Sequence, residues 1–185
     1  MQAGRLSCAY YNMQSQQRED RKPGYKSGDI LPYLGQDYIL EVRQYPSYRK
    51  PGVQLVGERL LVLTAKTDPA TVGKAVLEWY CARACRIIPE RVEFYRKQIG
   101  KPVNSIRIKD VRSRWGSCSS KANLNFNWRL VLAPMEVLDY VVVHEMCHLK
   151  EMNHSKAFWD LVGEILPDYQ KQREWLKRCK LIERF

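Results

Sequence analysis

The chain has 185 residues, of which 45% are hydrophobic and 28% charged, and its formal net charge is +11. Because no apolar run approaches the roughly 20 residues of a bilayer span or forms a secretory signal, we expect a cytoplasmic protein without a membrane partner. Residues 71–130 hold 13 Lys/Arg against 4 Asp/Glu, whereas residues 131–185 hold 8 against 9. The basic middle of the chain therefore indicates either an anionic partner, such as a nucleotide or nucleic acid, or an ordinary solvated surface.

The N-terminal third divides into two parts. Residues 1–27 are polar and turn-rich, which predicts a flexible or divergent leader before a domain spanning residues 28–185. Within that domain, residues 28–66 contain short β-like segments separated by Gly and Pro turns. These segments predict a small antiparallel meander, and residues 68–185 are predicted to form the core.

A long helix is expected to begin with Asp68 as its N-cap and Pro69 at its first position, and to end before Gly100. Pro89 should kink or interrupt this helix, because proline lacks an N–H and clashes with the preceding turn.

The C-terminal half alternates between strands and helices. Residues 106–108 and 124–127 have the alternation typical of strands. Residues 137–149 are apolar on nearly every face, which predicts a buried central helix. Two short helices are expected to follow, one capped by Ser155 and one carrying Trp175.

The three histidines of the chain form one motif, His144-Glu145-x-x-His148-x5-His154. On a helix, His144 and His148 project from the same face, so both imidazoles can reach one ion. Glu145 lies about 100° further round the helix, out of the ligand set but within reach of the attacking water, where it can act as general base. Catalytic zinc sites use about three protein ligands, and the pattern therefore predicts a zinc hydrolase.

The third ligand imposes a geometric condition. In a continuous helix His154 would point roughly 120° away from the other two ligands. The chain must therefore turn between Leu149 and His154, with Asn153 as the expected left-handed residue.

The six cysteines are dispersed and form no Cys-x-x-Cys pair. Buried free thiols behave as small hydrophobic side chains and are typical of the cytosol. Free thiols are therefore expected rather than a disulfide framework.

Four segments carry a family resemblance: Arg112–Ser119, Leu124–Leu130, Asp139–His148 and Asn153–Trp159. Together they closely resemble the YgjP-like metallopeptidase family, a compact group of zincins related to the WLM and SprT-like domains. The resemblance runs from about residue 28 to the C-terminus. It implies an α+β zincin fold, in which a small mixed or antiparallel sheet places an edge strand over the central active-site helix.

Residue by residue, the resemblance implies zinc held by His144, His148 and His154, with Glu145 as general base. It also implies that residues 124–127 form the edge strand, where an extended peptide can pair and Asn125 can contact it. Metzincins share the histidine spacing but have Gly where this chain has Glu151, which excludes them.

Several neighbouring residues allow two interpretations. Arg114 or Ser117 either faces a substrate or belongs to a structural turn packed by Trp115. Tyr140 either lines the metal pocket or belongs to the core, and Cys118 is a candidate fourth zinc ligand.

Asp160 and Glu164 are both candidates to accept the second N–H of a ligand histidine.

The leading functional hypothesis is a zinc-dependent peptidase that acts on peptide or protein. A nucleoside triphosphate pyrophosphatase is the second, because some family members are assigned that activity and the middle of the chain is basic. A nucleic-acid-associated module with a structural zinc is the third, although such sites close the fourth position with Cys or His and no such ligand is obvious.

Overall fold

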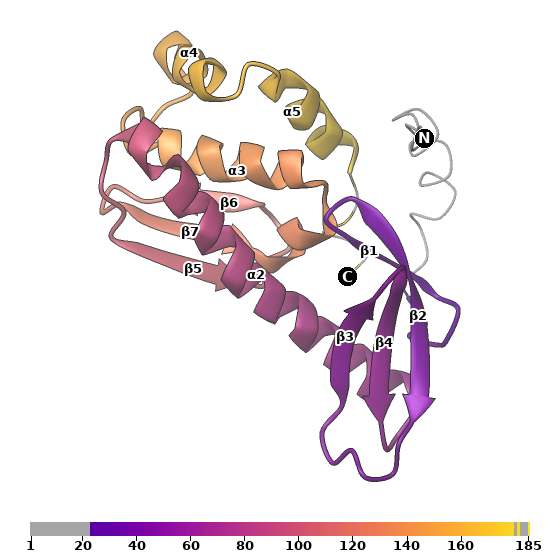
Figure 1. The fold of residues 1–185 in the computed structure, drawn as a ribbon. Coiled ribbons are helices and arrows are strands. Elements are labelled where there is room, and N and C mark those ends of the chain that lie inside the picture. Colours follow the sequence, from indigo (N-terminus) through magenta and orange to yellow (C-terminus); the bar gives the residue numbers. More distant parts are fainter. Residues whose placement is uncertain (1–22, 180, 182–184) are drawn as a thin grey trace.

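The structure is a computed structural model that describes residues 23–179, 181 and 185 (Figure 1). Its elements are β1 (Ile30–Tyr33), β2 (Gln36–Gln44), β3 (Gly52–Val56), β4 (Arg59–Thr64), α2 (Pro69–Ile99), β5 (Ser105–Lys109), β6 (Gly116–Cys118), β7 (Asn123–Asn127), the 3-10 helix η1 (Trp128–Leu132), α3 (Met135–Cys147), α4 (Lys156–Ile165) and α5 (Tyr169–Arg178). The architecture is α+β, as predicted, with the strands divided between two small sheets. The predicted leader lies almost entirely outside the described residues, so its boundary at residue 28 stays a prediction.

The N-terminal sheet has the strand order β1-β2-β4-β3 and is mixed rather than an antiparallel meander. Strands β2 and β4 run parallel, with Leu40 opposite Leu60, whereas β3 and β4 form an antiparallel hairpin. Because β4 carries the buried run Leu60–Val62, it takes the interior position and leaves the more exposed β3 at the edge. The predicted meander was therefore wrong in its topology.

Helix α2 crosses the molecule and joins the two sheets (Figure 1). The Asp68 carboxylate accepts a hydrogen bond from the backbone N–H of Thr71 at 2.9 Å, and Gly100 ends the helix in the left-handed conformation. Both predicted ends are confirmed. Helix α2 continues through Pro89, so the predicted interruption does not occur, and a kink there stays a prediction. The carbonyl left without its donor belongs to exposed Cys85, where water can satisfy it.

The second sheet has the order β5-β7-β6, with β7 parallel to β5 and antiparallel to β6. Its central strand β7 buries Leu124 and Phe126 on the face that packs against α2 and α3. Residues 124–127 are therefore not the edge strand, and that sequence prediction was wrong. The strand next to α3 is β6, whose three residues are too few to show a β-like pattern in the sequence.

The predicted central helix, α3, is buried along almost its whole length. Arg91 of α2 donates two hydrogen bonds to the carboxylate of Asp139 on α3, at 2.6 and 2.8 Å, and the Tyr95 hydroxyl donates a third. This buried pair locks α3 against α2. Within the described part of the chain, no helix combines the length and the apolar character needed to cross a bilayer.

Candidate metal centre

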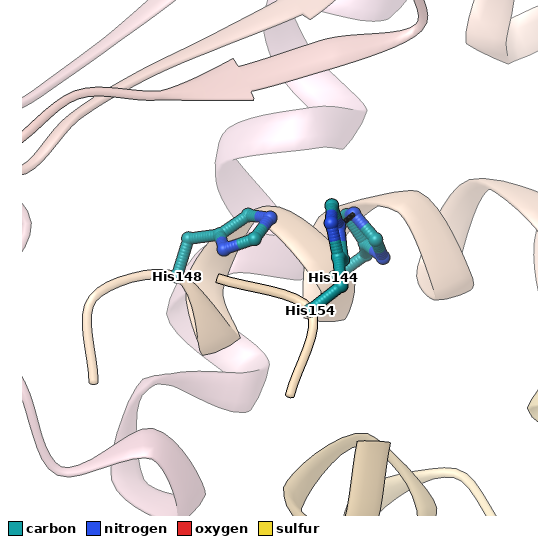
Figure 2. Close-up of side chains that lie close together, drawn as sticks. All are labelled: His144, His148 and His154. Carbon is teal, nitrogen blue, oxygen red and sulfur yellow. Dashed lines mark hydrogen bonds between the residues drawn. The ribbon is translucent and has the colours of Figure 1, made fainter. Parts of the chain in front are cut away.

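Three imidazoles converge at the end of α3 (Figure 2). One nitrogen of each of His144, His148 and His154 lies within 4.8 Å of the others. The Nε2 atoms of His144 and His154 are 3.0 Å apart. The structure thus brings together the three residues that the sequence predicts as ligands.

The chain turns after α3, as the geometry of the motif requires. The helix ends at Cys147, whose carbonyl accepts hydrogen bonds from the N–H groups of Lys150 and Glu151, both at 3.0 Å. Asn153 does not have a positive φ, so its predicted left-handed conformation was wrong. Instead, its side-chain oxygen accepts a hydrogen bond from the N–H of Ser155 at 3.2 Å, and Ser155 caps α4 as predicted.

His148 is held by the same turn. Its Nδ1 lies 2.9 Å from the carbonyl oxygen of Glu151. Because a carbonyl only accepts, Nδ1 carries the proton and the lone pair of Nε2 is free to bind a metal. The acceptor is a backbone oxygen rather than either predicted carboxylate, since Asp160 pairs with Lys156 and Glu164 is exposed.

The electrostatic environment favours the neutral form of two of the imidazoles, those of His144 and His154. The pKa of His144 is lowered to about 3, mainly by burial and to a smaller extent by the neighbouring His148 and His154. The pKa of His154 is also lowered, mainly by burial. Neutral imidazole is the metal-binding form, so the lowered pKa values of His144 and His154 favour cation binding.

The donors fit a divalent transition metal. Nδ1 of His144 is buried without a hydrogen-bond partner among the described residues, while its Nε2 faces a second imidazole nitrogen. Two facing lone pairs are satisfied when both bind one cation, at about 2.0–2.1 Å for zinc. Three imidazoles suit zinc and several of its neighbours in the periodic table.

Glu145 lies beside the histidines and is only 7% exposed. Burial raises its pKa to about 7, against the opposing positive charge of Arg114. A Cβ atom on Gly116 of β6 would lie 2.7 Å from both Cγ and Oε1 of Glu145. The carboxylate therefore packs directly on the β6 backbone, and any larger residue at position 116 would displace the Glu145 side chain, a role of Gly116 that the sequence analysis missed.

Aromatic rings from α4 and α5 support the histidines. The ring of Phe158 is fully buried, with its centroid 4.5 Å from that of His148, 4.8 Å from His154 and 4.9 Å from His144. Trp159 stacks on His154 at 5.5 Å, and Tyr169 stacks on Trp159 at 5.4 Å. The position of Phe158 and Trp159 shortly after the third histidine is the one sequence signal that could have identified them as part of the site.

The remaining predicted residues divide between the two sides of the sheet. Tyr140 is 5% exposed and packs edge-on to His144, so it belongs to the core and flanks the site at once. Burial raises the pKa of its hydroxyl to about 12, which keeps it neutral. Arg114 is exposed and close enough to Glu145 for its charge to act on the carboxylate.

Asn125 is not brought to the histidines. Gly116 pairs with Phe126 and faces Glu145, so the alternating residues Ser117 and Asn125 point to the opposite face. Their side chains hydrogen-bond to each other there at 3.2 Å.

Cys118 faces the same side as Gly116 but lies outside the group of potential metal ligands found among the described residues. Burial, assisted by the charge of Glu145, raises the pKa of its thiol to about 11. The thiol is therefore protonated at neutral pH in the absence of a metal, and its place outside the histidine group does not favour a ligand role.

Comparison with known proteins gives this site a family context. A model of the family described as "YgjP-like, metallopeptidase domain" matches residues 5–179, and so begins upstream of residue 28. The UTP pyrophosphatase of Escherichia coli (strain K12) is 34% identical over 74 residues, which cover 38% of this chain and less than half, 44%, of that relative. The crystal structure of the zymogen of the Pyrococcus abyssi metallopeptidase abylysin superposes with a TM-score of 0.45 at 20% identity, covering 48% of this chain and 90% of that one. With most of its length matched by the family model, the chain belongs to the YgjP-like metallopeptidase family.

Proposed function

We propose that the chain is a zinc-dependent peptidase in which His144, His148 and His154 hold the metal and Glu145 is the general base. One observation carries this proposal: three imidazoles converge beside a buried carboxylate that touches the backbone of an edge strand. No other group of potential metal ligands is found in the described part of the chain.

The residues divide the chemistry between them. Zinc, when bound, supplies a Lewis acid that polarises the scissile carbonyl and lowers the pKa of water. Glu145 takes the proton from the attacking water and returns it to the leaving amine. Contact with Gly116 and burial between α3 and β6 limit the movement of the carboxylate, so little reorganisation is needed when the proton moves.

The edge strand β6 supports a peptide as substrate. In the order β5-β7-β6, one edge of β6 pairs with β7, and its other edge pairs with no described strand. A free edge next to α3 can accept an extended peptide through backbone hydrogen bonds, which places a peptide bond close to Glu145. The resemblance assigned this role to residues 124–127. Because β7 is the central strand, we assign the role to β6 instead.

The test combines metal content with hydrolysis of a peptide library. Glu145→Gln should retain about one metal per chain and lose hydrolysis by about 10²–10⁴-fold, because only the proton acceptor is removed. His148→Ala should lose both the metal and the activity.

Glu151→Gln is the matched control, since only the backbone oxygen of residue 151 contacts His148 and the variant should keep both properties. Full activity in Glu145→Gln would refute the role of this residue as general base.

A second candidate is hydrolysis of a nucleoside triphosphate. The named activity of the E. coli relative favours it, as does exposed Arg114, whose charge reaches Glu145 and which forms no ion pair with another described residue. Release of pyrophosphate or phosphate from UTP that disappears in Glu145→Gln, with no peptide cleavage, would select this activity instead.

A further inference from the structure

The outer face of the three-stranded sheet presents a second surface. Ile106 and Ile108 of β5 pack toward the core, so Arg107 and Lys109 alternate to the other side and are exposed. Arg107 lies opposite Asn125, which in turn lies opposite Ser117, so these three side chains form a row across the strands. This face, defined by Arg107, Lys109, Asn125 and Ser117, points away from Glu145.

Positive charge on and around this face is not neutralised. In residues 97–121, neither Arg107 and Lys109 of this face nor Arg112 and Lys121, in the loops before and after β6, form an ion pair with another described residue. The one carboxylate in this stretch, Asp110, is bound by Arg129 at 2.5 Å. By contrast, several helical cations have a partner on their own helix, as in the pair of Arg86 with Glu90.

The chemistry of the face narrows the choice of partner. Neutral hydrogen-bonding groups, the amide of Asn125 and the hydroxyl of Ser117, lie beside the cations. None of the exposed large hydrophobic residues in the described chain belongs to this sheet; they are Ile39, Tyr45, Tyr48, Val56, Phe94 and Met152. Protein interfaces have apolar, aromatic-rich centres, and membrane-surface binding needs apolar anchors, so neither partner fits.

We propose that this basic sheet face binds the phosphate backbone of a nucleic acid without reading its bases. Arg, Lys, Ser and Asn side chains supply most phosphate contacts in such complexes, and they are the residues present here. No large aromatic side chain is exposed on the described part of this face, so base stacking and a preference for single strands are not expected. The surface does not depend on the proposed hydrolysis, because it lies on the opposite side of the sheet from Glu145.

The test is fluorescence anisotropy of a short labelled DNA duplex titrated with the full-length chain at several salt concentrations. If Arg107, Lys109, Arg112 and Lys121 each neutralise one phosphate, the slope of log K against log salt should be about −3 to −4. In the double variant Arg107→Gln, Lys109→Gln, this slope should become less negative by about 2, because two phosphate contacts are lost.

The matched control is Lys50→Gln, Lys66→Gln, which removes the same charge from exposed positions beside the N-terminal sheet and should leave the slope unchanged. Glu145→Gln should bind DNA like the unaltered chain. If both double variants lost the same amount of DNA affinity and salt dependence, binding would reflect net charge alone, and the proposal would be overturned. Displacement of DNA by polyglutamate of equal charge at equal concentration, or no binding at low salt, would overturn it as well.

Discussion

The two faces of the three-stranded sheet come from the same strands but have opposite chemistry. On the inner face, Phe126 is buried, and Gly116 leaves room for the carboxylate of Glu145. On the outer face, the side chain of Arg107 is exposed, and the side chain of Asn125 hydrogen-bonds to Ser117. Because side chains alternate along a strand, one short sequence can form a wall of the candidate metal site on one side and a polar, basic surface on the other.

The largest expected difference between the faces is in stability. Phe126→Ala removes a ring that is 1% exposed and leaves a cavity, so it should lower the free energy of unfolding by about 3–5 kcal/mol. Arg107→Ala, on the outer face of the adjacent strand β5, should stay within about 0.5 kcal/mol. Urea unfolding of both variants measures this, and a loss below about 1 kcal/mol for Phe126→Ala would contradict the assignment of faces.

A smaller but more specific effect is expected at Gly116. Gly116→Ala would place a methyl group 2.7 Å from Glu145 and displace its carboxylate, which should lower kcat/KM by about 100-fold while metal content is unchanged. Ser117→Ala is the control, because the next residue points to the outer face. Unaltered kcat/KM in Gly116→Ala would show that the position of Glu145 against β6 does not matter for hydrolysis.

The smallest effect is expected for Asn125→Ala. This change removes the hydrogen bond to Ser117 and should lower the free energy of unfolding by about 0.5–1.5 kcal/mol. Because Asn125 lies on the face away from the histidines, KM and kcat should stay within about twofold. A clear rise in KM would instead restore the substrate-binding role that the family resemblance gave this residue.

Local signals explain which parts of the fold were predictable. The ends of α2 followed from Asp68 and Gly100, whose preferences act within one helical turn. Pro89 misled because the cost of a missing helical hydrogen bond depends on whether the free carbonyl is exposed, which is a tertiary property. The parallel pairing of β2 with β4 was not predictable from alternation alone, since alternation does not specify the partner strand.

The same division applies to the site. The sequence by itself determined the histidine motif, because residues four apart on a helix share a face and a third ligand at this spacing forces the chain to turn. Only the tertiary structure decided how that turn is made, which strand lies over Glu145 and which way Asn125 points. Each of these depends on strand pairing or contacts between distant residues, and a shift of one residue in register would reverse every side chain on β6 and β7.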